Sequence, residues 1–126
     1  MSVLLDTCAL ITLANGDLPA AAGKALGDAA SAYVSSCSAW EVAIKCKSGR
    51  LRLLVPPHTW FLDVCRRHHL TEIPLQAHLL CAAADLPLIH RDPFDRVIVA
   101  TAMEKNLAIL TSDSVIPTYP GVRTVW

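Results

Sequence analysis

The sequence has little that would mark a secreted, membrane-bound or disulfide-stabilised protein. No apolar run approaches the roughly 18 residues that a membrane span needs. The first apolar stretch is interrupted by Asp6, so we expect no signal peptide. The five cysteines are scattered, and none form a Cys-x-x-Cys pair. This usage is typical of small core residues in a reducing compartment, so we expect a cytoplasmic protein that does not cross a membrane.

An excess of charge of one sign is also absent. The 11 lysines and arginines balance the 11 aspartates and glutamates, and no basic tail is present. This balance argues against a general electrostatic binder of DNA. It does not exclude a nucleic-acid substrate, because local charged patches and bound metal ions matter more than the net charge.

The sequence is rich in apolar residues for its length. Its 126 residues fit one domain, residues 1–126, and 53% of them are hydrophobic, with a mean hydropathy of +0.41. A small globule has a large surface, so part of this apolar content is expected to stay exposed. Exposed apolar area usually marks a partner site. We therefore expect self-association, a protein partner or both.

Short apolar runs alternate with helical patterns along the chain. Strands are predicted at residues 3–5, 32–36, 70–73, 108–110 and 122–126, and helices at 7–14, 19–30, 38–48, 59–68, 75–84 and 93–105. We expect Ser38 to be the N-cap of helix 38–48. Strands that alternate with helices favour an α/β fold with a central parallel sheet flanked by helices on both faces. Ligands bind to such sheets at the carboxyl ends of the strands.

Four acidic residues lie at or near these carboxyl ends. Asp6 follows the first strand, and Glu41 lies in the first turn after the second strand. Asp95 opens the helix before the fourth strand, and Asp113 follows the fourth strand. In a doubly wound sheet these positions can converge at one edge, so we expect them to share a pocket.

Carboxylates in one pocket repel one another, which raises some of their pKa values and destabilises the fold. A divalent cation removes this conflict. Oxygen-only ligands suit Mg²⁺ or Mn²⁺ rather than zinc. A metal-bound water with a lowered pKa can attack phosphorus, and the metal stabilises charge on the phosphate oxygens. An all-acid site therefore indicates phosphodiester hydrolysis.

Each acid alone also has an ordinary structural interpretation. Asp6 could cap the helix that follows it, and Asp113 could make a simple turn. Glu41 and Lys45 have the i,i+4 spacing of a surface ion pair on a helix. Asp92-Pro93-Phe94-Asp95 is typical of an ordinary helix start, with its first aspartate as the N-cap. The metal-site hypothesis therefore rests on all four acids falling near the same predicted sheet edge.

Several stretches match one known family in its order along nearly the whole chain. They are Val3-Leu4-Leu5-Asp6-Thr7, Val34-Ser35-Ser36, Ser38-Ala39-Trp40-Glu41-Val42-Ala43-Ile44-Lys45, His90-Arg91-Asp92-Pro93-Phe94-Asp95-Arg96 with Val99-Ala100-Thr101-Ala102, Leu110-Thr111-Ser112-Asp113 and Val125-Trp126. Together they resemble PIN domains of the VapC type, the toxin half of bacterial VapBC toxin–antitoxin pairs. The most specific stretch is similar to the Asp-Pro-Phe-Asp-Arg signature of one VapC subgroup.

The resemblance implies a PIN-like fold and a Mg²⁺-dependent endoribonuclease that cleaves an RNA substrate. It implies that Asp6, Glu41 and Asp95 bind the metal, with Asp113 completing the catalytic pocket. It also implies a homodimer that is held inactive by a VapB-type antitoxin lying over the active-site groove. Thr7 and Thr111 are expected to offer hydroxyls to the metal's water shell or to the substrate.

Other polar residues have more open assignments. By its position, Asp92 is expected to cap a helix rather than to bind metal. Arg91 and Arg96 could contact RNA phosphate, neutralise the acids or lie solvated at a helix end. The five histidines, among them His90, lack metal-ligand spacing, so a zinc site is not expected.

Two other functions are alternatives to the nuclease. A phosphoacceptor domain of the receiver type needs an acidic pair after the first strand, but Asp6 stands alone there, and the third strand ends at Pro74. A non-catalytic RNA- or protein-binding module on the PIN fold is the second alternative. Loss of a pocket acid would favour it, and none is lost.

Overall fold

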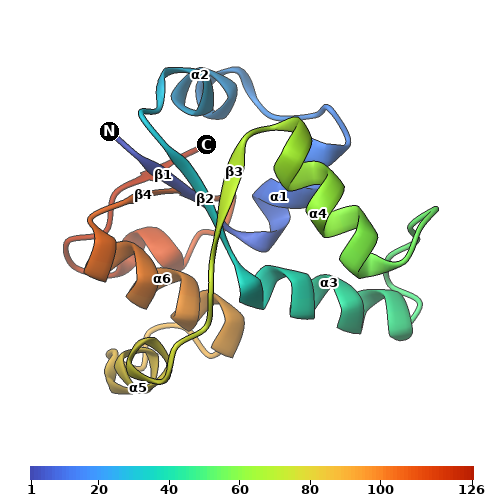
Figure 1. Cartoon of the computed structure of the whole chain (residues 1–126). Coiled ribbons are helices and arrows are strands. Elements are labelled where there is room, and N and C mark those ends of the chain that lie inside the picture. The colour runs from blue at the N-terminus through green and yellow to red at the C-terminus, as the bar shows by residue number, and fades with distance from the viewer.

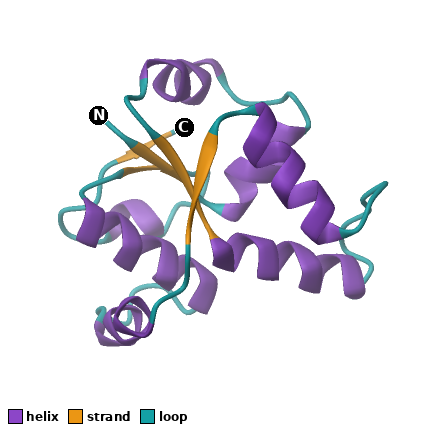
Figure 2. Cartoon of the chain, in the orientation of Figure 1, coloured by secondary structure: helices purple, strands orange, loops and turns teal.

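The computed structural model describes all 126 residues and contains one five-stranded parallel sheet (Figures 1 and 2). The strand order across the sheet is β3-β2-β1-β4-β5, and every neighbouring pair is parallel. The strands are β1 (Val3–Leu5), β2 (Ala32–Ser35), β3 (Leu70–Ile73), β4 (Ala108–Leu110) and β5 (Thr124–Val125). The chain crosses over helices between strands, so the carboxyl ends of all strands lie at one edge.

Helices cover both faces of this sheet, as the sequence predicts. They are α1 (Thr7–Ala14), α2 (Ala20–Asp28), α3 (Ser36–Lys47), α4 (Pro57–Arg67), α5 (Ala77–Asp85) and α6 (Pro93–Lys105). In Figure 1, α1 and α4 lie on one side of the sheet and α5 and α6 on the other. Helix α3 leaves the carboxyl end of β2 and contacts α1, α4 and α6.

Alternating side chains of the short strands supply the two hydrophobic cores. In β1, Leu4 packs into the core under α5 and α6, whereas Val3 and Leu5 pack into the core under α1 and α4. All three are fully buried. This double burial explains why the strand reads as an unbroken apolar run rather than as an alternating one.

The predicted start of α3 is wrong. The helix begins at Ser36, and the Ser35 hydroxyl caps it by accepting the Cys37 N–H at 3.1 Å. Ser38, the expected N-cap, lies inside the helix and is fully buried, where its Oγ accepts the Thr7 hydroxyl at 3.0 Å. The earlier start carries Glu41 from the expected first turn into the second turn.

The other differences are small. Helices α2, α4 and α5 begin or end one or two residues away from the predicted bounds, and the last strand is limited to Thr124–Val125. A short 3₁₀ helix, η1 (Ile116–Thr118), was not predicted. The strands at 3–5, 70–73 and 108–110 and the helices at 7–14 and 93–105 match their predicted bounds.

Part of the apolar content stays on the surface, as composition predicts. Trp40 is 61% exposed and packs edge-on against Phe94, with ring centroids 5.2 Å apart. Leu54 and Leu88 are almost fully exposed. None of the helices combines the length and the apolar character needed to cross a bilayer.

Candidate active site

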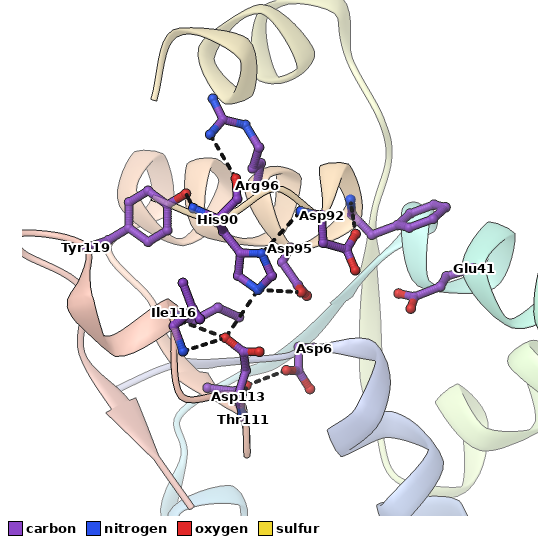
Figure 3. Close-up of polar contacts among 12 residues, drawn as sticks. Asp6, Glu41, His90, Asp92, Asp95, Arg96, Thr111, Asp113, Ile116 and Tyr119 are labelled. Atoms are coloured by element: carbon purple, nitrogen blue, oxygen red, sulfur yellow. Dashed lines mark hydrogen bonds and ion pairs between the residues drawn. The ribbon is translucent and has the colours of Figure 1, made fainter. Parts of the chain in front are cut away.

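A polar cavity of about 590 Å³ opens at the carboxyl ends of β1 and β4. The four predicted acids all line it, together with other polar groups and a single thiol (Figure 3). The lining residues are Asp6, Thr7, Cys8, Glu41, Lys45, Arg50, His90, Asp92, Asp95, Ser112, Asp113 and Ser114. Residues more than 100 positions apart in the sequence therefore meet here because parallel strands end at one edge.

Asp6 is placed at the junction of β1 and α1 and is almost completely buried. Its Oδ1 accepts the Ala9 N–H at 2.8 Å, so the capping interpretation is correct. Its Oδ2 accepts the hydroxyl of Thr111. Burial raises the pKa of Asp6, although the two hydrogen bonds oppose this rise. One carboxylate therefore both starts a helix and contributes charge to the pocket.

Glu41 reaches the pocket from α3. Its Oε2 lies 3.2 Å from Nζ of Lys45, so the predicted i,i+4 ion pair forms. The pair is not a solvated surface feature, because the Glu41 and Lys45 side chains are only 13% and 24% exposed and both line the cavity. Lys45 thus brings a cation to the rim of an acidic site.

Asp95 lies in the first turn of α6, directly above the pocket. Burial, the charge of Asp92 and more weakly those of Asp6 and Asp113 raise its pKa to about 7, despite the opposing influence of His90. Asp92 caps α6 by accepting the Phe94 N–H at 2.9 Å, as expected from its position. The raised pKa reflects first the burial of this carboxyl and then the negative charge of the neighbouring acids.

Asp113 makes the turn that leads from β4 to η1. Its Oδ2 accepts the N–H groups of Val115 at 2.9 Å and Ile116 at 2.8 Å. Partial burial acts to raise the pKa of Asp113, but these two N–H donors and the nearby His90 hold it below its usual value. The protein therefore stabilises the charge of Asp113, in contrast to the charges of Asp6 and Asp95.

Sequence reasoning missed His90. Its Nε2 lies 3.0 Å from Oδ2 of Asp95 and 3.3 Å from Oδ2 of Asp113 (Figure 3). The only sequence signal is that His90 immediately precedes the Arg91-Asp92-Pro93 helix start. Histidine spacing alone could not reveal it, because its partners are acids on α6 and after β4.

Of the two threonines, only Thr111 contacts the acids directly. The Thr111 hydroxyl donates to Asp6, and its Oγ1 accepts the Asp113 N–H at 2.9 Å. The Thr7 hydroxyl donates to Ser38 at 3.0 Å. In this structure both threonine hydroxyls are therefore engaged with protein groups, and Thr111 links two of the acids.

The structure does not support the expected RNA contact of Arg96. The side chain is buried, and its guanidinium donates to four backbone carbonyls, those of Ala84, Leu86, Pro87 and His90, at 2.9–3.3 Å. It does not line the acidic cavity. Arg96 instead ties the segment between α5 and α6 to the first turns of α6.

The donor set suits a hard divalent cation. The carboxylates of Asp6, Glu41 and Asp95 line the cavity, and ligand atoms of His90, Asp95 and Asp113 lie within 4.8 Å of one another. Burial and the neighbouring acids raise the pKa values of Asp6 and Asp95, and a dication in the cavity would offset this cost of ionisation. The residues present therefore fit such an ion.

Comparison with known proteins decides the family. The family model described as "PIN domain" matches residues 3–121. The chain belongs to the PIN domain family. This assignment confirms the predicted family and sets aside the receiver-type alternative.

Individual proteins resemble the chain over most of its length. The chain is 29% identical over 112 residues to Ribonuclease VapC22 of Mycobacterium tuberculosis. The aligned region covers 86% of this chain and 85% of that protein. The fold is similar to a chain of VapBC2 from Rickettsia felis bound to a promoter DNA fragment, with a TM-score of 0.69, 15% identity and coverage of 98% and 97%. The fold is also similar to a chain of a toxin–antitoxin complex from Klebsiella pneumoniae, with a TM-score of 0.66 and 21% identity. That match covers 95% of this chain and 94% of the other chain.

Proposed function

We propose that this PIN domain is a Mg²⁺-dependent endoribonuclease that acts as the toxin of a toxin–antitoxin pair. The observation that carries the proposal is the convergence of Asp6, Glu41, Asp95 and Asp113 in one cavity. The similarity to a protein named a ribonuclease, and to chains of toxin–antitoxin complexes, supports the same activity. The free cysteines and the expected RNA substrate favour action in the cytoplasm.

Asp6, Glu41 and Asp95 would hold the ion, Mg²⁺ or alternatively Mn²⁺, with Asp113 completing the acidic wall. When bound, this ion supplies a nucleophilic water and Lewis-acid stabilisation of phosphate charge. Thr111 keeps the Asp6 carboxylate in place through its hydroxyl. Lys45 and Arg50, which line the same cavity, are positioned to attract an RNA phosphate.

The expected partners are an RNA substrate, an antitoxin of the VapB type and a second copy of the chain. The apolar side chains on the surface, including Trp40 and Leu88, provide area that a protein partner could cover. An antitoxin over the acidic cavity would block RNA and so keep the nuclease inactive.

The test is cleavage of total cellular RNA by purified protein free of any partner, with Mg²⁺ and with EDTA. We expect discrete Mg²⁺-dependent fragments from the wild type and none from Asp95→Asn. Asp17→Asn is the matched control, because Asp17 is an exposed aspartate outside the cavity. A folded wild type that cuts no RNA with Mg²⁺ or Mn²⁺ would instead favour the non-catalytic binding module.

A further inference from the structure

A second cavity, of about 540 Å³, opens beside the amino ends of β1, β4 and β5, and we call it the amino-end cavity. It shares no residue with the acidic cavity at the carboxyl ends of the strands. In Figure 1 the label N marks this end of β1, and α1 follows the opposite end. The residues that line the amino-end cavity are Met1, Ser2, Tyr33, Thr71, Glu72, Ile73, Pro74, Lys105, Asn106, Leu107 and Arg123.

Two basic side chains of this cavity have no acidic partner. Lys105 is the last residue of α6, and Arg123 directly precedes β5. Neither forms an ion pair with a carboxylate. The one carboxylate that lines the cavity, that of Glu72, accepts the Ser36 hydroxyl instead. The positive charge of the two side chains is therefore uncompensated within the protein.

The end of α6 uses only part of this positive charge. Asn106 has a left-handed backbone, with φ 54°, and ends the helix. Its carbonyl and its side-chain oxygen each accept from Nη2 of Arg123 at 3.2 Å, which is a common use of a cation at a helix C-terminus. Nη1 and Nε of Arg123 and Nζ of Lys105 make no bond within the protein. The contact with Asn106 therefore fixes the guanidinium and leaves two of its nitrogens free to donate.

Hydroxyl groups add neutral donors to the same cavity. Ser2, Tyr33 and Thr71 line it, and none of their hydroxyls makes a hydrogen bond within the protein. A phosphate group carries negative charge and several acceptor oxygens, and a guanidinium matches its geometry. The donors of the amino-end cavity therefore suit a phosphate better than they suit a neutral ligand.

The cavity is larger than a phosphate group alone requires. Its volume of about 540 Å³ lies within the range of roughly 300–1,000 Å³ that is typical of small-molecule sites. Ile73, Leu107 and the ring of Tyr33 line it as well, and Tyr33 packs against the core under α5 and α6. These side chains offer apolar surface to the base or the sugar of a nucleotide.

We propose that the amino-end cavity binds the phosphate group of a nucleotide, with Lys105 and Arg123 as its cationic contacts. The nucleotide is a free mononucleotide or part of an RNA chain, because both present this group. The site is independent of the proposed nuclease, since it shares no residue with the acidic cavity and requires no metal.

The test is a titration of the full chain in EDTA, followed through its backbone amide NMR signals, with AMP, adenosine and a short single-stranded RNA as probes. We expect AMP or the RNA to shift the signals of Ser2, Thr71 and Leu107, and adenosine to bind far more weakly. Lys105→Gln should weaken binding at least about 10-fold, because it removes a hydrogen bond between charged partners. Lys47→Gln is the matched control, because Lys47 is the exposed last residue of α3 and lies outside this cavity.

Arg123→Gln should have a similar effect, with Arg52→Gln as its matched control. Because Arg123 also contacts Asn106, thermal unfolding checks that this variant is folded, whereas Lys105→Gln removes no bond of the fold.

Binding of AMP would support the proposal with a free nucleotide as the ligand, and binding of the RNA alone would assign the site to an RNA chain. The proposal would be overturned if no probe shifts the signals of this cavity, if adenosine binds as tightly as AMP, or if both variants bind like the wild type. A wild type that binds AMP here but cuts no RNA would retain this site and refute only the proposed function.

Discussion

The carboxyl group of Asp95 is the point at which the demands of folding and of the proposed chemistry conflict. Burial and neighbouring carboxylates raise its pKa to about 7, so the metal-free fold disfavours its ionised form. An amide at this position would not carry this cost of ionisation. Local rules broken without structural compensation are expected at functional sites.

Asp95→Asn is predicted to stabilise the metal-free protein at pH 8. In the wild type, stability falls as pH rises from the unfolded pKa near 4 to the folded pKa of about 7, because the folded state releases its proton later. This rise in the pKa of Asp95 corresponds to roughly 4 kcal/mol of unfolding free energy, which solvent screening reduces to about 1–2 kcal/mol. Urea unfolding in EDTA measures this gain, which should disappear near pH 4.

Asp17→Asn is the control for that comparison and should leave the unfolding free energy nearly unchanged at both pH values. A wild type whose metal-free stability is flat between pH 4 and 7, or an Asp95→Asn variant that is less stable at pH 8, would contradict the assigned electrostatics.

Thr111→Val is predicted to weaken Mg²⁺ binding. The substitution keeps the shape of the side chain but removes the hydroxyl that donates to Asp6 and accepts from Asp113. Groups that orient metal ligands typically contribute about 10–100-fold to metal affinity or activity. Calorimetric Mg²⁺ titration measures the loss. Thr101→Val is the matched control, because the buried Thr101 hydroxyl donates only within α6, to the Val97 carbonyl. Unchanged Mg²⁺ affinity in Thr111→Val would argue against the orienting role of Thr111.

At the scale of elements, the segment between α5 and α6 is organised by one buried arginine. Arg96 donates to three carbonyls of this segment, those of Leu86, Pro87 and His90, and to that of Ala84 in the last turn of α5. The hydroxyl of Tyr119, which follows η1, accepts the backbone N–H of His90. An arginine on α6 therefore shapes the pocket without entering it.

Arg96→Lys is predicted to lower the unfolding free energy by about 2 kcal/mol or more, because one ammonium cannot satisfy four carbonyls that the guanidinium fork reaches. Chemical denaturation measures this change. If Arg96 instead served RNA binding, the variant would keep its stability and raise KM alone. Arg91→Lys, an exposed neighbour, should keep wild-type stability.

The sequence predicted most elements because apolar strands and helix starts leave local signals. Helix 93–105 begins at an Asp-Pro pair and was predicted correctly, since capping depends on adjacent residues. The start of α3 was not, because Ser35, Ser36 and Ser38 all suit an N-cap. The choice depends on burial of Ser38 against Thr7, which is 31 residues away.

The acids of the site were found for the same reason, because strand ends are predictable and parallel strands end together. His90 was missed because its place depends on Arg96 and on Tyr119, which lies 29 residues further along the chain. No local pattern encodes that arrangement. The roles assigned to the pocket residues, and the extent of the domain over residues 1–126, stay predictions.

At the scale of the whole molecule, two hydrophobic cores pack on opposite faces of the sheet, and acidic side chains gather at the edge where its strands end. The core side chains come from the strands and from the helices that cover them. The acids are therefore held in place by the same packing that stabilises the fold. Binding of a cation at this edge should therefore be visible in global stability.

Mg²⁺ is predicted to raise the Tm of the wild type, since an ion that binds only the folded state adds about 2.7 kcal/mol at 100 times its Kd. Removal of the ion with EDTA should reverse the increase. Thermal unfolding with and without Mg²⁺ checks this, and Asp95→Asn should respond far less than Asp17→Asn. An equal response of all three proteins would indicate nonspecific ion binding.

The measurement that tests the central claim most directly is the chemistry of the RNA ends left by the partner-free protein in Mg²⁺. If a water held at the acidic pocket attacks phosphorus, as proposed, the products should carry a phosphomonoester and a hydroxyl. A single 2′-deoxy nucleotide at the cleavage position should then leave cutting intact. Products with 2′,3′-cyclic phosphate ends, and no cutting of the 2′-deoxy substrate, would show attack by the RNA's own hydroxyl and contradict the account.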